Sequence, residues 1–367
     1  MRNNNHISRN EKVAILIEQG VEDVEFLVPF NALKQAGIEV VVLGSRMNEK
    51  YKGKRGKLSI QADATTTEVV ADEFAAVVIP GGMAPDKMRR NCNTVCFVME
   101  AMKQGKLIAA VCHGPQLLIE GDLLKGKQVT GFAAICKDIT NAGANYLDEP
   151  VVVDGNLITS REPGDLAIFT TVLLNSLGYG GKDAVLPNEK DTGAEWWKLA
   201  DAWGGSTKNE IVKGLNTALG GERYSLEALE KYLQKESDQE VKNLFREMIA
   251  NKNQHIEKLE SYLHRLHEKP SLTANIANQY AKLKTALTGS ENIYQIRCAL
   301  GDIQTAIGDI GNLSAMLTDP VATAIFKEIH NDLGKYEQRL VELYRARIAA
   351  GVRPPKPTTS RGAVTQV

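Results

Sequence analysis

The most informative segment of the chain is Ala109-Ala-Val-Cys-His-Gly-Pro-Gln116. An apolar run from Leu107 to Val111 ends at Cys112, and helical spacing begins at once over residues 116–124. Such a strand-to-helix turn lifts the side chain at its tip clear of the sheet and places it at the start of a helix, where free N–H groups favour negative charge. We therefore expect a nucleophile elbow in which the pKa of the Cys112 thiol is lowered towards the thiolate.

The residues beside Cys112 decide between two interpretations of this cysteine. A cysteine that ends a buried strand is often only a small core residue. Gly114 and Pro115 favour the elbow, because they allow a sharp turn and start a helix directly. His113 adds a proton carrier next to the thiol.

Residues 12–178 alternate short apolar strands with amphipathic helices. Strands are expected at 12–17, 38–43, 74–79, 107–111 and 128–132, and the Asp-Gly at 154–155 predicts a hairpin within 151–158. This alternation is typical of a mainly parallel sheet with helices on both faces. The predicted class of this domain is α/β.

The rest of the chain has a different pattern. Residues 179–205 are rich in Gly, Lys, Asp and Pro and are expected to form a linker, and residues 206–350 have only helical spacing, with breaks expected near Gly289 and at Gly308–Gly311. Short connections between helices predict an antiparallel all-α bundle. The polar leader 1–11 and the Pro/Thr-rich tail 351–367 are expected to be disordered.

Composition excludes several classes of function. The chain of 367 residues has a formal net charge of −1, so it offers no basic field for nucleic acid and no polybasic membrane patch. No apolar run approaches the ~20 residues that span a bilayer. Five cysteines without disulfide or zinc spacing fit a reducing compartment, and we expect a cytoplasmic protein.

Acidic residues follow the first strand, at the edge of the sheet where Cys112 is expected. In parallel sheets, active sites lie beyond the carboxyl ends of the strands. The helix dipole explains Glu22 and Asp23 as acids of a first turn. Glu25 lies among apolar residues one turn further on, where burial would raise its pKa and allow it to share a proton with the Cys112 thiol. Glu22 remains a possible secondary site residue.

Two glycines follow the third strand at the same edge. Backbone N–H groups in the Gly81–Gly82 turn can hold a developing oxyanion. Asp86 follows Pro85 closely, and its position alone explains it as an acid early in a helix.

Taken together, these motifs resemble the PfpI family, the intracellular cysteine peptidase and deglycase branch of the class I glutamine-amidotransferase-like superfamily. The matching segments are Val21–Phe26, Ile79–Gly82, Ala84–Asp86, Ala110–Leu118, Asn141–Ala144 and Val151–Ser160. They occur in family order over nearly all of residues 12–178. The resemblance implies a flavodoxin-like fold, in which helices sandwich a mainly parallel sheet.

The resemblance also implies roles for individual residues. Cys112 matches the nucleophile, His113 its triad partner, and Glu25 the glutamate that hydrogen-bonds the sulfur. The backbone N–H groups of Gly82 and His113 match the oxyanion donors. Asp86 stands where the family's triad acid reaches the histidine from an adjacent subunit, which implies a homo-oligomer with active sites at subunit interfaces.

The implied function is a cysteine hydrolase without a cofactor that acts in stress protection. Its substrate would be a peptide, a glycated amine or a small carbonyl compound such as methylglyoxal. An alternative is a redox-sensing or chaperone-like stress protein, in which the reactive Cys112 is oxidised and no substrate is turned over.

The helical region raises the question of a metal site. Di-iron bundles place a glutamate on each of two helices and Glu-x-x-His on the other two. Here Glu222 could lie level with Lys252-x-x-His255, and Lys327-x-x-His330 lies on the last helix. The region is weakly similar to ferritin-like bundles, but lysine replaces the carboxylate in both pairs. We therefore expect no metal and interpret the bundle as a scaffold or a docking module for a protein partner.

Overall fold

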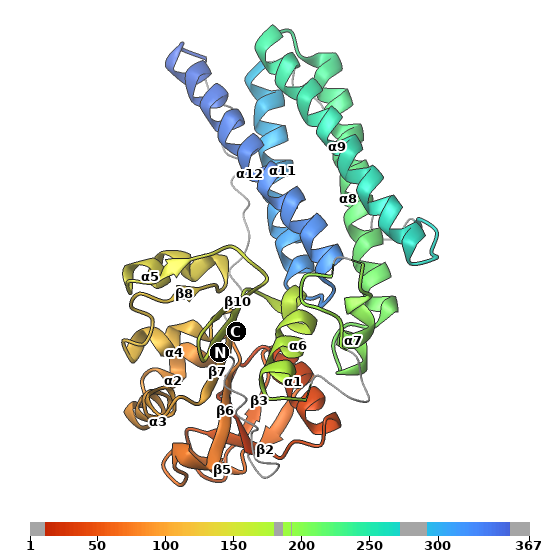
Figure 1. Ribbon diagram of the computed structural model, residues 1–367. Coiled ribbons are helices and arrows are strands. Elements are labelled where there is room, and N and C mark those ends of the chain that lie inside the picture. The colour runs from red at the N-terminus through yellow and green to blue at the C-terminus, as the bar shows by residue number, and fades with distance from the viewer. Residues whose placement is uncertain (1–11, 180–185, 192, 272–291, 353–367) are drawn as a thin grey trace. The chain divides into compact units, whose positions relative to one another are not determined.

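The computed structural model describes residues 12–179, 186–191, 193–271 and 292–352 (Figure 1). The chain forms two compact units. The α/β unit runs to Ile211 and also includes Ala315–Thr323, and the helical unit comprises Val212–Ser314 and the chain from Ala324 onward. The predicted leader 1–11 and almost all of the predicted tail lie outside the described residues.

The α/β unit is built on one main sheet. Within the described residues it has seven strands in the order β10-β11-β7-β6-β1-β2-β5. All neighbouring pairs are parallel except the β10–β11 hairpin, which confirms the mainly parallel sheet. The strands of this sheet are β1 (Lys12–Ile17), β2 (Val40–Gly44), β5 (Ala64–Thr65), β6 (Phe74–Ile79), β7 (Leu107–Val111), β10 (Val151–Asp154) and β11 (Leu157–Ser160). Two small ribbons pair β3 (Lys50–Lys52) with β4 (Ser59–Gln61) and β8 (Gln128–Val129) with β9 (Asn145–Tyr146).

Helices cover both faces of this sheet, as predicted. Figure 1 shows α1 and α6 on one side and α2, α3 and α4 on the other. The helices of this unit are α1 (Asp23–Gln35), α2 (Ala84–Met88), α3 (Cys92–Lys103), α4 (Pro115–Glu120), α5 (Cys136–Asn141), α6 (Leu166–Ser176) and α7 (Trp196–Ala202), with 3-10 turns at Ala71–Glu73, Ala133–Ile135 and Pro163–Asp165. Every residue of β6 is buried, because a central strand covered on both faces must be apolar throughout. The expected linker thus contains α7.

The helical unit contains four long helices in the described residues. They are α8 (Lys208–Lys235), α9 (Gln239–Arg265), α11 (Asn292–Ser314) and α12 (Pro320–Ala349). Side-chain hydrogen bonds join α8 to α11 through Tyr232 and Asp302, and α9 to α12 through Asn251 and Asp332. None of the described helices is long and apolar enough to cross a membrane.

The break predicted at Gly308–Gly311 is wrong, because α11 continues through both glycines. A helix tolerates an interior glycine at a cost of about 1 kcal/mol relative to alanine, and the packing of a long helix offsets that cost. The break expected near Gly289 lies outside the described residues.

The connection between α11 and α12 returns to the α/β unit. The N–H of Ser206 donates to Thr318 Oγ1 over 2.7 Å, and the N–H of Thr318 donates to Ser206 Oγ over 3.1 Å. The Arg55 guanidinium donates to the carbonyl of Ala315 over 2.8 Å. The segment Ala315–Thr323 is therefore hydrogen-bonded into the α/β unit at two points.

Candidate active site

Cys112 lies at the turn between β7 and α4, where the sequence predicts it. Its φ of 60° is in the left-handed region, which costs a non-glycine residue of the order of 1 kcal/mol or more. Backbone hydrogen bonds hold this conformation, since the Cys112 N–H donates to Ser160 and the Cys112 carbonyl accepts from Phe132, both over 3.0 Å. The side chain is buried. The elbow geometry is therefore present.

Glu25 reaches the same point from the first turn of α1 and is completely buried. Its Oε2 accepts the N–H of Gly81 over 2.8 Å. Oε1 has no partner that meets full hydrogen-bond geometry, and the Cys112 thiol is the group that interacts with this carboxyl. The fold thus brings together two side chains that are far apart along the chain, as the sequence predicts.

Burial controls the acidity of this pair. The pKa of Glu25 is raised to about 8, first by burial and then by the charge of Glu22, against hydrogen bonds from Cys112 and Gly81 that lower it. Burial also raises the pKa of the Cys112 thiol, and a charged Glu25 raises it further. The expectation that the elbow lowers the pKa of the thiol is therefore wrong. The six-residue helix α4 does not outweigh the loss of water, and the two groups titrate as a coupled pair.

Two backbone N–H groups face the sulfur. Those of Gly82 and His113 form hydrogen bonds with Cys112 that favour its charged form and so lower its pKa. They are the two donors that the sequence analysis named for an oxyanion. Gly81 leaves no room for a side chain, because a Cβ there would lie 2.6 Å from Glu25 Oε2 and 2.7 Å from the His113 backbone nitrogen.

The ring of His113 packs against Phe132, with ring centroids 5.2 Å apart. Burial lowers the pKa of His113, while a hydrogen bond with Gln116 and the charge of Asp86 raise it. Asp86 itself is exposed on the short helix α2. Within one chain, Asp86 thus acts on His113 through its charge, and its predicted contact across subunits stays a prediction.

Two basic residues at this site were missed by the sequence analysis. Glu22 is buried and forms ion pairs with Arg55 and with Lys54, the latter over 3.3 Å. Asp23 accepts the N–H groups of Arg55 and Leu58, both over 2.7 Å, and so anchors the loop that carries the basic residues. The run of glycine and basic residues at 52–57 was the available signal, but only the tertiary fold places it beside Glu22.

The raised pKa of Glu25 predicts a pH-dependent stability. A carboxyl group whose pKa rises on folding binds its proton more tightly in the folded state, so the free energy of unfolding falls as pH rises from about 4.5 to about 8. At ~1.4 kcal/mol per pKa unit, Glu25 would contribute a fall of up to about 5 kcal/mol. Urea denaturation at pH 5, 7 and 9 should show this fall in the wild-type protein and a smaller one in Glu25→Gln. Parallel curves for the two proteins would contradict the assignment.

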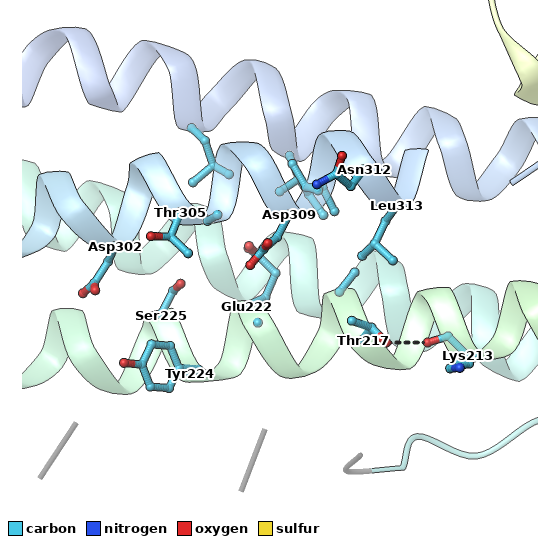
Figure 2. A pocket seen from close by; sticks show the side chains of 16 residues that line it. Lys213, Thr217, Glu222, Tyr224, Ser225, Asp302, Thr305, Asp309, Asn312 and Leu313 are labelled. Atoms are coloured by element: carbon cyan, nitrogen blue, oxygen red, sulfur yellow. Dashed lines mark hydrogen bonds between the residues drawn. The ribbon is translucent and has the colours of Figure 1, made fainter. Parts of the chain in front are cut away.

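The helical unit contains a cavity of about 600 Å³ between α8, α11 and α12. Figure 2 shows Glu222, Asp302 and Asp309 among the side chains that line it. Close to Glu222, on α9 and α12, the ligand atoms of His255, Glu328 and Asp332 lie within 4.8 Å of one another. These three are the residues in the described chain that come nearest to a metal-binding group.

Comparisons with known proteins agree with the architecture. The sequence profile of the DJ-1/PfpI family matches residues 11–176. YraA of Bacillus subtilis, whose name refers to a cysteine protease, is 41% identical over 168 residues, which are 46% of this chain and 99% of the relative. Protein/nucleic acid deglycase 2 of Escherichia coli is 40% identical over 170 residues, 46% of this chain and 99% of the relative.

A solved structure from Anabaena variabilis resembles both units. It is described as a two-domain protein with DJ-1/ThiJ/PfpI-like and ferritin-like domains. The two chains are 78% identical, and the structures match with a TM-score of 0.88. The match covers 95% of this chain and 99% of the Anabaena chain. Through residues 11–176 the chain belongs to the DJ-1/PfpI family, to which it adds a C-terminal helical region.

Proposed function

We propose that the α/β unit is a cysteine-dependent hydrolase of PfpI type that acts in stress protection, with Cys112 as its nucleophile. The observation that carries this proposal is the convergence of the Glu25 carboxyl group and two backbone N–H groups on the Cys112 sulfur. The names of the relatives support two substrate classes, a small carbonyl compound or glycated amine, and a peptide.

The geometry supports a definite sequence of bond changes for a peptide substrate. Glu25, with a pKa of about 8, takes the thiol proton, and the sulfur attacks the carbonyl carbon. As the S–C bond forms, the carbonyl electron pair moves to oxygen, which accepts hydrogen bonds from Gly82 and His113. The oxyanion then re-forms the C=O bond as the C–N bond breaks, and the leaving amine takes the proton held by Glu25, which leaves a thioester on Cys112. His113, kept neutral by burial, accepts a proton from the water that attacks this thioester. The S–C bond then breaks, the acid is released, and the proton on His113 returns to the Cys112–Glu25 pair.

Three substrates test this proposal against its alternative. Methylglyoxal, a glycated peptide and casein are each incubated with the wild-type protein and with Glu25→Gln. We expect turnover of at least one substrate and a loss of that turnover in the variant. If peroxide selectively oxidises Cys112 by mass spectrometry while no substrate is turned over, the redox-sensing or chaperone-like function is favoured instead.

A mixing experiment tests the proposed homo-oligomer with shared active sites. Asp86→Ala should lower turnover at least about tenfold, because His113 loses its acidic partner. Cys112→Ser provides an intact Asp86, and Asp86→Ala provides an intact Cys112. If Asp86 acts across subunits, unfolding and refolding the two variants together should give more activity than the sum of the two variants refolded separately. An Asp86→Ala protein with full activity would remove the shared triad and leave the role of Cys112 intact.

We also propose that the helical unit is a scaffold or docking module for a protein partner. Its exposed surface carries many ion pairs, such as Lys258–Glu328 and Arg339–Glu247, and such a surface is compatible with either role.

A further inference from the structure

A buried network of charged groups joins three helices of the helical unit. Lys252 Nζ on α9 lies 2.7 Å from Glu222 Oε1 on α8, and His255 Nδ1 lies 2.9 Å from Glu222 Oε2. The other ring nitrogen of His255 lies 3.3 Å from Asp332 on α12. Glu222, Lys252 and His255 are 5%, 2% and 1% exposed, so water cannot neutralise this carboxylate.

The same three residues can be compared, helix by helix, with the ligand pattern of a ferritin-like carboxylate bundle. Such bundles use a glutamate on one helix and Glu-x-x-His on its neighbour. Glu222 and His255 supply two of these groups, but position 252 has an ammonium group where the second carboxylate would be. A protonated lysine has no lone pair to offer a metal. The donor set therefore does not fit the di-metal centre that the fold suggests.

We propose that the ammonium group of Lys252 takes the place of the metal ion in this bundle, as the internal cation that neutralises Glu222. Burial alone would raise the pKa of Glu222, but Lys252 and His255 hold this pKa below its ordinary value. Glu222 is thus a full negative charge in the interior and requires a cation. The chain supplies that cation itself, and the fold of the helical unit becomes independent of metal.

In the second cluster of potential metal ligands, lysines likewise neutralise the carboxylates. His255, Glu328 and Asp332 could together face an ion. However, Glu328 is paired with Lys258 over 2.5 Å and Asp332 with Lys335 over 2.8 Å. Each carboxylate of this group therefore already has a lysine as its counter-ion.

Cobalt binding by the full-length chain tests the proposal. The wild-type protein, Lys252→Glu and Lys252→Gln are incubated with Co²⁺, passed over a desalting column and analysed for bound metal and for visible Co²⁺ bands. We expect no retained Co²⁺ in the wild-type protein. Lys252→Glu, which restores the carboxylate, should retain about one ion or more per chain. Lys252→Gln, which removes the ammonium group without adding a ligand, should retain none and melt at a lower temperature.

Controls separate this site from unspecific binding. Lys242→Glu makes the same charge change on α9 away from the network and should behave as the wild type. Stoichiometric Co²⁺ in the wild-type protein that is lost in His255→Ala would overturn the proposal, as would a folded Lys252→Glu that retains no metal. If Lys252→Glu does not fold, the test rests on the wild-type protein, through its Co²⁺ retention and its melting temperature with and without chelator. A melting temperature that chelator leaves unchanged, with no retained Co²⁺, supports the proposal.

Discussion

Cys112→Ser is expected to reduce turnover of every substrate of this protein by at least about 10³-fold. The serine hydroxyl keeps nearly the same volume at the elbow, so the backbone at φ 60° and the two facing N–H groups should persist. What is lost is the acidity of the nucleophile. A carboxyl group with a pKa of about 8 can take the proton of a thiol, even one whose pKa is raised by burial, but is far too weak a base for an alcohol. Initial rates with the three substrates measure the loss.

The matched control is Cys92→Ser. Cys92 is exposed at the start of α3, and the same exchange of sulfur for oxygen there should leave turnover unchanged. Iodoacetamide labelling followed by mass spectrometry adds an independent measurement, because the label at Cys112 should depend on pH through the Glu25 pair. Activity that survives Cys112→Ser would contradict the proposed nucleophile.

Gly81→Ala is the second change for which we expect a large effect. The added methyl group would lie within 3 Å of three atoms, Glu25 Oε2, the His113 nitrogen and Cys112 Cβ. Two of these belong to the rigid elbow, so the site must shift rather than a flexible side chain. A displacement of about 1 Å at a reacting centre costs roughly 10²-fold in rate, and overpacking costs about 1–3 kcal/mol of stability. The expected result is a 10²-fold or larger loss in kcat/KM with a lower Tm.

Gly301→Ala provides the comparison. Gly301 lies within α11, and a Cβ there meets no heavy atom within 4 Å. The same chemical change should leave turnover intact and slightly raise Tm, because alanine favours the helix by about 1 kcal/mol. Wild-type kinetics in Gly81→Ala would show that the turn between β6 and α2 is not packed against the elbow as described.

The sequence predicted the parts of the site that depend on local pattern. The strands at Lys12–Ile17, Phe74–Ile79 and Leu107–Val111 were predicted to the residue, because buried parallel strands are unbroken apolar runs. Since these strands end at one edge of the sheet, the sequence alone predicts that Glu25, the glycine turn and Cys112 lie together.

The parts that failed depend on long-range packing. The pKa of Cys112 was predicted in the wrong direction, because burial of the thiol and the charge of Glu25 on α1 raise it, and neither depends on the elbow pattern alone. The short strands β3 and β4 were missed, since two strands of three residues carry almost no periodic signal. Lys54 and Arg55, which neutralise Glu22, lie in the connection between these strands. The local sequence does not predict that this loop lies beside Glu22.

The return of Ala315–Thr323 to the α/β unit determines how the two halves of this protein can be separated. A stop codon after Ile211 removes the helices, but it also removes Thr318 and Ala315, which bind Ser206 and Arg55. Since Arg55 also forms an ion pair with Glu22, whose charge acts on Glu25, a simple deletion of the C-terminal half would disturb the carboxyl group that we propose as the base. Its effect on turnover would then be mistaken for regulation by the missing helices. Point variants on α8, α9 and α12 are the cleaner genetic probe of what the helical unit contributes.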